Sequence, residues 1–374
     1  MSTEQTPAAL GYRMPAEWEP HAATWLSWPR REGISFPDAY DRVLPTFREM
    51  VATLLTSEPV CINVSNGAHE AEARAVLDEL PQERLTYYTI PTNEPWCRDH
   101  GPIFLTRDNR SGDWSRPAPG PLPRTERREG APAPESSPLA IVDWGHNAWG
   151  GKYPPFDLDD VVPTRVAEAL GLPVWQGGMI LEGGSIDVNG TGALLTTESC
   201  LLNRNRNPNM TREQIETRMR DYLGVRDIFW LSRGTEGDDT DGHIDNLARF
   251  VDERTVLAVV ENNRRDANYE PLQENLELLR EIRIDGEPLE IIELPMPAEI
   301  HREDLRLPAS YANFYIANSV ILVPTFDDSN DDAAVGTIQD AFPERRVAAI
   351  DCRELIWGLG AFHCLTQQQP ATPR

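Results

Sequence analysis

One supersecondary pattern recurs along the chain and limits the fold more than any other feature. Residues 185–197 (SIDVNGTGALLTT) are two alternating runs around an Asn-Gly pair, the strongest short signal for a β-hairpin. A helical stretch over 211–223 and a short apolar strand over 227–231 follow. The same order of hairpin, helix and strand returns at 247–294 and at 313–351, with hairpins roughly 65 residues apart. Such a period indicates a repeated structural unit.

Two weaker copies of the unit lie upstream. Runs at 102–106 and 139–144 would pair as a hairpin, and residues 24–65 read as strand, helix and strand. A Pro- and Arg-rich insert at about 109–138 separates the strands of that hairpin, and its composition is typical of a mobile loop. We therefore expect an α/β fold of about five units, closed as a ring within a single domain that spans residues 1–374.

The charge balance and the cysteines exclude several classes of protein. The net charge is −25, from 60 acidic and 35 basic residues, which disfavours nucleic acid as a partner. No apolar run reaches the roughly 20 residues that a membrane helix needs, and no secretory signal is present, so we expect a cytoplasmic location and no membrane contact. Five scattered cysteines predict neither a disulfide framework nor a zinc site. We expect no bound metal.

Ionisable residues stand at the same place in successive units. Asp99, Glu182 and the pair His243 and Asp245 each precede the first strand of a hairpin, and Cys364 follows the last strand. Equivalent positions of a ring converge on its axis, so we expect these five side chains to meet. The segment after Cys364 should then close the ring against the N-terminal strand.

Each of these residues also has a structural interpretation. Asp99 could pair with the adjacent Arg98 or form a turn, Glu182 could be an exposed turn carboxylate, and His243 could be a hydrogen-bonded core residue. Cys97 is a rival nucleophile. The shared position in the repeat favours the functional interpretation, because four independent coincidences would otherwise be required.

A thiol, an imidazole and three carboxylates favour one kind of chemistry. Clustered carboxylates repel one another unless a cation lies among them, and a planar guanidinium matches carboxylates in pairs. A guanidinium held in this way presents its central carbon to a thiolate. The imidazole can then protonate departing ammonia and activate water. The residues therefore predict deimination of a small cationic guanidine through an amidino-cysteine, without a cofactor.

The motifs resemble those of the agmatine deiminase family in order and over nearly the whole chain. The stretches that carry the resemblance are EPWCRDHGP, AWGGKYPPFDLDD, LEGGSIDVNGTGALLTTESCLLNRNRNP, DDTDGHIDNLARFV, YANFYIANSVILVP and FHCLTQQQP. The resemblance implies the five-bladed, pseudo-symmetric α/β propeller of guanidine-modifying enzymes, the pentein fold. It also implies hydrolysis of agmatine to N-carbamoylputrescine and ammonia, a step of putrescine and polyamine biosynthesis.

The resemblance also implies roles for individual residues. Cys364 matches the nucleophile, His243 the general acid and base, and Glu182 the carboxylate that orients the histidine. Asp99 and Asp245 match the pair that binds the guanidinium. In addition, Trp96 would pack on the substrate. Lys152, the only lysine, falls in a family motif without an assigned role.

Two departures from the family pattern bear on the substrate. The run before the nucleophile reads GLGAFHC, where the family usually has three glycines, an asparagine and an isoleucine before His-Cys, and His100 replaces a common threonine. Alternative functions therefore stay open: a deiminase of another guanidine (free or peptidyl arginine), an amidinotransferase, or a non-catalytic guanidine-binding protein. Assembly into a homo-oligomer is also compatible with the sequence.

Overall fold

The computed structural model describes residues 5–107 and 137–372, and within them the fold is mixed α/β. The insert expected at about 109–138 lies almost wholly outside the described residues. Five sheets of three or four strands account for most of the described strands, and two short hairpins complete them. In each of the five sheets a central strand pairs antiparallel with one neighbour and parallel with the other.

The unit predicted around residues 185–231 has the expected order. Strands β8 (Asp187–Val188) and β9 (Ala193–Thr197) form the antiparallel hairpin, and β10 (Asp227–Leu231) adds parallel to β9. The crossover between them contains α6 (Glu198–Leu201) and α7 (Arg212–Leu223). A capping box fixes the start of α7, since its N-cap threonine and third-position glutamine exchange hydrogen bonds with the backbone.

The next two units repeat this arrangement. Their strands are β11 (Ala248–Phe250), β12 (Thr255–Val260) and β15 (Glu290–Pro295), then β18 (Tyr315–Ile316), β19 (Val320–Thr325) and β20 (Arg346–Asp351). Helices α8 (Tyr269–Glu281) and α9 (Asp331–Ala341) form the crossovers. Parallel strands need such a crossover, which is why each helix follows a hairpin in the sequence.

The upstream hairpin is also confirmed. It consists of β5 (Ile103–Arg107) and β6 (Leu139–Gly145), followed by α5 (Val162–Leu170) and the parallel strand β7 (Val174–Ile180). The short strand β1 (Tyr12–Arg13) extends this sheet at its edge.

The fifth sheet joins the two ends of the described chain. Its strands β2 (His21–Ser27), β3 (Val60–Val64) and β4 (Leu85–Thr89) are parallel, and β21 (Thr366–Pro370) lies antiparallel to β2. Helix α1 (Tyr40–Leu55) crosses from β2 to β3, and α2 (Gly67–Val76) from β3 to β4. The expected closure of the C-terminal segment against the N-terminal strand is therefore confirmed.

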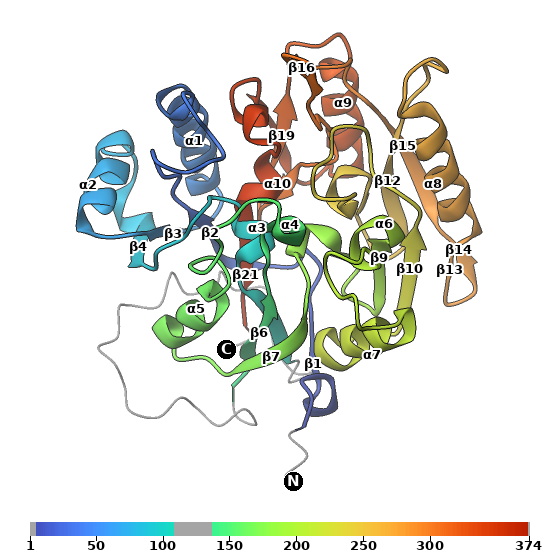
Figure 1. Ribbon diagram of the computed structural model, residues 1–374, viewed down its shortest axis with the longest axis horizontal. Helices are drawn as coiled ribbons and strands as arrows, with labels where there is room; N and C mark the ends of the chain where they lie inside the picture. Colours follow the sequence, from blue (N-terminus) through green and yellow to red (C-terminus); the bar gives the residue numbers. More distant parts are fainter. Residues whose placement is uncertain (1–4, 108–136, 373–374) are drawn as a thin grey trace.

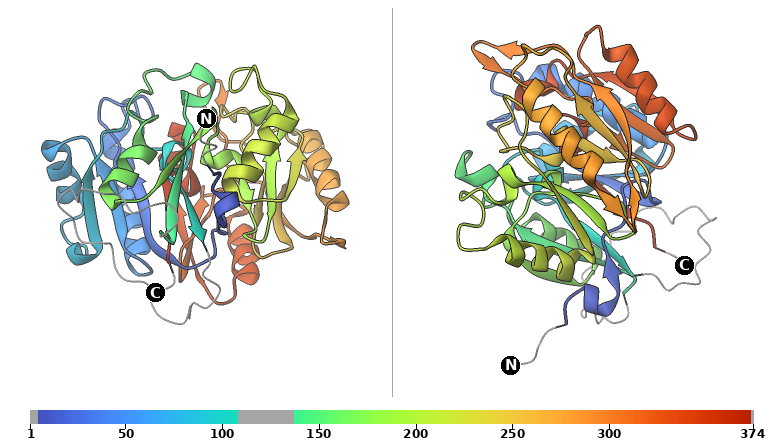
Figure 2. Two further views of the ribbon diagram at one scale, coloured as in Figure 1. Left: turned by 90° about the horizontal axis from the view of Figure 1, so that it is seen from below. Right: turned by 90° about the vertical axis from the view of Figure 1, so that its right-hand side faces the viewer.

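Short helical turns at the start of each unit lie together near the middle of the molecule. These turns are α3 (Cys97–His100), η3 (Gly183–Ser185), η4 (Ile244–Asn246) and α10 (Phe362–Leu365). Helix α3 contacts both α10 and η3, and η3 contacts η4. Figure 1 shows the long helices on the outside and α3 and α10 in the middle, and Figure 2 shows the peripheral helices from two further sides.

Several small elements were not anticipated from the sequence. They are η1 (Ala8–Leu10), η2 (Gln82–Arg84), α4 (Ala148–Gly151), β13 (Arg283–Ile284), β14 (Glu287–Pro288), β16 (His301–Arg302), β17 (Leu305–Arg306) and η5 (Leu355–Gly358). Each is too short to show a hydrophobic period. Within residues 5–107 and 137–372, no helix combines the length and the apolar character needed to cross a bilayer.

Candidate active site

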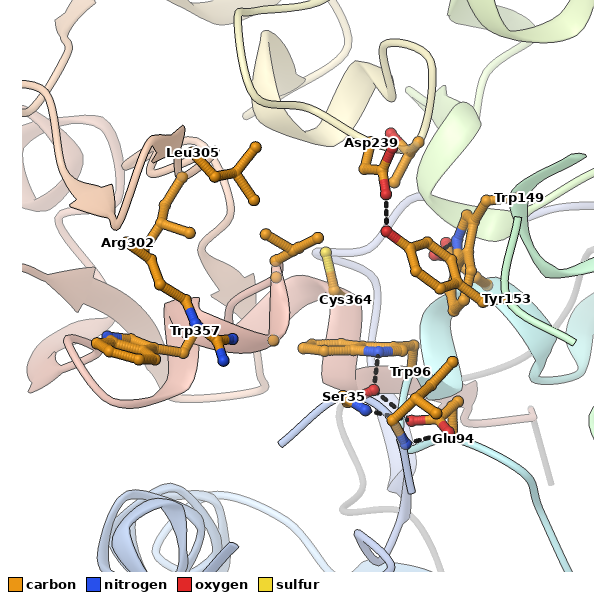
Figure 3. Close-up of a pocket in the computed structure, with 17 residues that line it drawn as sticks. Ser35, Glu94, Trp96, Trp149, Tyr153, Asp239, Arg302, Leu305, Trp357 and Cys364 are labelled. Carbon is orange, nitrogen blue, oxygen red and sulfur yellow. Dashed lines mark hydrogen bonds between the residues drawn. The ribbon is translucent and has the colours of Figure 1, made fainter. Parts of the chain in front are cut away.

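A cavity of about 210 Å³ opens where the central turns meet, and its lining includes Cys364 and Asp99. In Figure 3 the sulfur of Cys364 lies next to the indole of Trp96. Trp149 and Tyr153 lie on one side of that sulfur, and Arg302 and Trp357 on the other. Drug-sized ligands occupy pockets of roughly 300–1,000 Å³, so this cavity suits a small molecule.

The thiol of Cys364 contacts an amide and faces a carboxylate. Asn313 donates from Nδ2 to Cys364 Sγ at 3.1 Å and accepts from Cys364 N at 3.3 Å, while Asp245 Oδ2 lies 3.6 Å from the sulfur. Burial, reinforced by the charges of Asp245 and Asp99, raises the pKa of the Cys364 thiol well above its usual range. These effects favour the protonated thiol, whereas a cation bound nearby would favour its ionisation.

The carboxylate of Asp99 is fixed on both oxygens. Oδ1 accepts from Gly184 N at 3.0 Å, and Oδ2 accepts from Trp149 Nε1 at 2.8 Å. Trp149 lies in α4 with a positive φ of 55°, a costly backbone conformation for a bulky residue, and there its indole reaches Asp99. Burial, opposed by His243 but reinforced by Asp245, raises the pKa of Asp99 to about 6.

The carboxylate of Asp245 is oriented by the residue next to the nucleophile. His363 lies with Nδ1 2.8 Å from Asp245 Oδ2 and with Nε2 2.8 Å from Glu17 Oε2. Glu17 in turn accepts from Arg98 and Arg249 at 3.0 Å each. Burial alone would raise the pKa of Asp245, but the hydrogen bond and charge of His363 outweigh it and lower that pKa. Oδ1 of Asp245 is buried without a protein partner, so it is free to accept from a ligand.

The imidazole of His243 is fully buried beside these carboxylates. Its Nδ1 lies 3.6 Å from Asp99 Oδ1, and among the described residues neither ring nitrogen meets a partner in hydrogen-bonding geometry, although the Cys200 thiol lies beside the ring. Burial would lower the pKa of His243, but Asp99, Cys200 and Asp245 outweigh it and raise that pKa well above the usual range. The surrounding groups thus favour the imidazolium form of His243, which can donate a proton.

The glycine of the central turn is required by this crowding. A Cβ atom on Gly184 would lie 2.6 Å from His243 Nδ1, 2.8 Å from Asp99 Oδ1 and 3.0 Å from Asp245 Oδ2. No side chain fits between three groups at these distances. The same numbers show that turns from two units bring Asp99, His243 and Asp245 to the glycine of a third, as the repeat predicts.

Glu182 reaches the same place from η3 but is held by an arginine. Its Oε1 accepts from Arg206 Nε at 2.7 Å, and Oε2 has no partner. Burial would raise the pKa of Glu182, but the charge of Arg206 outweighs it and lowers that pKa. No hydrogen bond joins Glu182 to His243 within the described residues, so any effect on the imidazole would act through charge.

One group of potential metal ligands exists in the part of the chain that the structure describes. Glu182, Cys200 and His243 each place a ligand atom within 4.8 Å of the others, and all three are buried. Because they come from separate segments, no sequence spacing could reveal them. The guanidinium of Arg206 at 2.7 Å from Glu182 supplies the positive charge that the carboxylate needs and disfavours a second cation.

The remaining cysteines are less accessible than Cys364. Cys364 is 5% exposed and lines the cavity, whereas Cys97 is fully buried outside it. Burial raises the pKa of Cys97 to about 12 and also raises that of Cys364, so access to the cavity is what distinguishes the two thiols. The lining of the cavity contains no other cysteine among the described residues.

The structure also shows which groups Trp96 and Lys152 contact. Trp96 lines the cavity and donates from Nε1 to Ser35 Oγ at 2.8 Å, which fixes its ring. Lys152 lies 2.8 Å from Asp241 Oδ1 and donates to the carbonyl of Asp239 at 2.6 Å. Lys152 thereby ties down the segment that forms one wall of the cavity.

A family model described as Porphyromonas-type peptidyl-arginine deiminase matches residues 13–370. The chain belongs to this family.

Relatives over the full length support the assignment. The agmatine deiminase of Ectopseudomonas mendocina is 36% identical over 390 residues, covering 98% of this chain and 97% of the relative. The solved agmatine deiminase of Enterococcus faecalis superposes with a TM-score of 0.86 at 29% identity, covering 99% and 98% of the two chains. A Cys-to-Ser variant of C. jejuni agmatine deiminase with substrate bound gives a TM-score of 0.82 at 28% identity, covering 97% of each chain.

The departures from the family pattern are visible in the site. Leu359, at a usual glycine, has a positive φ of 71° and lines the cavity. Ala361 takes the place of the usual asparagine, yet an amide still contacts the nucleophile because Asn313 supplies it. His100 is buried with Nε2 3.0 Å from Ser27 Oγ, and burial lowers its pKa, so it is a neutral core residue.

The residues that the sequence did not reveal contact the site residues across sequence separations of 24 residues or more. They are Glu17, Trp149, Arg206, Asn313 and His363. Of these, His363 was the easiest to predict, because it adjoins Cys364 in the sequence.

Proposed function

We propose that this protein hydrolyses the guanidinium group of agmatine to N-carbamoylputrescine and ammonia through a covalent bond to Cys364. The observation that carries the proposal is that Cys364 and Asp99 line a small cavity. Three more ionisable groups, His243, Asp245 and Glu182, are fully buried beside them. The choice of agmatine as the substrate rests on the relatives that are agmatine deiminases.

Binding of the guanidinium rests on two carboxylates. Asp99 lines the cavity, and Asp245 Oδ1 is buried without a partner, so both can accept N–H groups of a planar cation. Trp96 and Trp149 present ring faces to the same cavity, where they can flank the flat guanidinium and the carbon chain. Burial, reinforced by the charge of Asp245, raises the pKa of Asp99, and a bound cation would offset both effects.

The first chemical step forms a carbon–sulfur bond. The bound cation favours ionisation of Cys364, whose proton passes to solvent, and the thiolate attacks the central guanidinium carbon. The C–N bond to one terminal nitrogen then breaks, and His243 supplies the proton with which that nitrogen leaves as ammonia. An S-alkylamidino group remains on Cys364, and His243 is left neutral.

The second step returns the enzyme to its starting state. Neutral His243 removes a proton from a water molecule as its oxygen attacks the amidino carbon. The C–S bond breaks, the electrons return to the sulfur, which takes up the remaining hydroxyl proton, and the urea group of N-carbamoylputrescine departs. The net reaction adds one water to the guanidinium and releases one ammonium ion. Glu182 favours the protonated form of His243 through its charge.

The same proposal covers the wider assignment. The five sheets would be the blades of a pentein propeller formed by one catalytic domain, residues 1–374. The reaction would belong to polyamine biosynthesis in the cytoplasm. The chain would also associate into a homo-oligomer, which light scattering of the purified protein would detect.

A purified sample incubated with agmatine should release ammonia. The His243→Ala variant keeps the nucleophile but lacks the group that activates water, a contribution of roughly 10²–10⁴-fold. Mass spectrometry of that variant after exposure to agmatine should find an amidino adduct on the peptide that contains Cys364. No ammonia from agmatine, or an adduct on the Cys97 peptide, would contradict the proposal.

A further inference from the structure

The acidic groups at the mouth of the cavity are already paired. Glu94 accepts from the backbone of Ile34 and Ser35 at 3.0 Å each and from the Ser35 hydroxyl. Asp239 accepts from the Tyr153 hydroxyl and lies 3.6 Å from Lys152 Nζ. Their charges are therefore compensated by neighbouring donors, and the mouth does not present an unpaired anion to a substrate amine.

The basic group at the mouth is unpaired. Arg302, from the β16–β17 hairpin, lines the cavity together with Cys364, and its guanidinium forms no hydrogen bond or ion pair with any residue of 5–107 or 137–372. The carboxylates that follow it in the hairpin, Glu303 and Asp304, make no ion pair with it. The guanidinium carbon stacks over the ring of Trp357, 4.7 Å from the ring centre.

The surroundings strengthen what this guanidinium can bind. Ile34 and Leu305 are 45% and 51% exposed and both line the same cavity. Apolar side chains at a mouth displace water, which makes a charge-assisted hydrogen bond stronger than on an open surface. Stacking on Trp357 also fixes the plane of the guanidinium, so less side-chain freedom is lost when a planar anion binds. Figure 3 shows Arg302 and Trp357 together, across the cavity from Trp149 and Tyr153.

We propose that Arg302 forms a carboxylate subsite, so that the enzyme also deiminates guanidines whose far end carries a carboxylate. The inference rests on the proposed deiminase function for the reacting end and concerns only the far end of the substrate. The guanidinium enters against Asp99 and Asp245, and the carboxylate receives two N–H groups from Arg302. The reaction is the same addition of water and release of ammonia, so no further reactant is required.

A matched pair of substrates tests the subsite. Agmatine and 4-guanidinobutanoate share the guanidinium and an alkyl chain but end in an amine and a carboxylate. Wild-type enzyme should release ammonia from both, and Arg302→Met should lower kcat/KM for 4-guanidinobutanoate about tenfold or more while that for agmatine stays equal or rises. For L-arginine, which carries both an amine and a carboxylate, Arg302→Met should lower kcat/KM by a smaller factor than for 4-guanidinobutanoate.

The chain offers a control for stacking alone. Arg42 also lies over Trp357, at 5.8 Å, but pairs with Glu354 and does not line the cavity. Arg42→Met should leave the ratio of the two substrates unchanged. Equal losses on both substrates in Arg302→Met, or no release of ammonia from 4-guanidinobutanoate by wild type, would overturn the subsite. Absence of activity on agmatine alone would instead refute the agmatine assignment.

Discussion

Replacing Trp149 by phenylalanine removes one hydrogen bond from the substrate-binding carboxylate and keeps most of the ring. The lost bond runs from Trp149 Nε1 to Asp99 Oδ2 at 2.8 Å and stabilises the ionised carboxylate. A hydrogen bond to a charged group contributes about 1.5–3 kcal/mol. Since 1.4 kcal/mol is a factor of ten, the ratio of ionised to protonated Asp99 should fall by about 10- to 100-fold.

The sign of the pH effect follows from the role of Asp99. Only the ionised carboxylate binds a guanidinium, and burial already raises its pKa to about 6, so kcat/KM of the wild type should decline as the pH falls through about 6. Loss of the indole donor disfavours the ionised form further. The acid limb of the Trp149→Phe profile should therefore move to higher pH by about one to two pH units.

The assay is kcat/KM for agmatine between pH 5 and 9, because this parameter reports ionisations of the free enzyme. Trp144→Phe is a matched control, since Trp144 is buried, its Nε1 has no partner, and it does not line the cavity. That variant should keep the wild-type profile. If Trp149→Phe instead lowers kcat/KM by the same factor at every pH and does not shift the acid limb, that result refutes the reasoning. Trp149 would then have only a packing role.

Three further outcomes are expected. Asp99→Asn should lower kcat/KM by at least about tenfold with an unchanged melting temperature, because a charge-assisted contact is lost; near-normal kinetics would make Asp99 only a turn residue. Dialysis against a strong chelator should leave the rate unchanged, whereas a loss restored by zinc would assign a metal to the cluster around His243. Cys364→Ser should abolish ammonia release while Cys97→Ser retains it. Full activity in Cys364→Ser would show that Cys364 is not the nucleophile.

Much of the fold could be predicted because each unit has a strong local pattern. The hairpin at 185–197 carries an Asn-Gly turn between alternating runs, and it is found as β8 and β9. The order of helix and parallel strand after each hairpin was equally visible in the hydrophobic periods. The hairpin β16–β17 was not, since two-residue strands carry no period, although it supplies Arg302 to the cavity.

The site was predictable only to the extent that the repeat places residues at equivalent positions. Asp99, His243 and Asp245 follow that rule, and the structure brings all three around Gly184. Their partners do not follow it. Asn313 reaches Cys364 from 51 residues away, and Glu17 reaches His363 across 346 residues. Contacts of this kind depend on how the units pack, and no local pattern in the sequence records them.

The pairing of β21 with β2 has a consequence for the order in which the enzyme is built. Synthesis proceeds from the N-terminus, so β2, β3 and β4 emerge from the ribosome well before their fourth strand. The exposed edge of β2 must wait for residues 366–370, and Cys364 arrives only just ahead of them. A nascent chain therefore contains Asp99 and Asp245 long before it contains Cys364. We expect the site to be complete only when β21 joins the sheet of β2, β3 and β4.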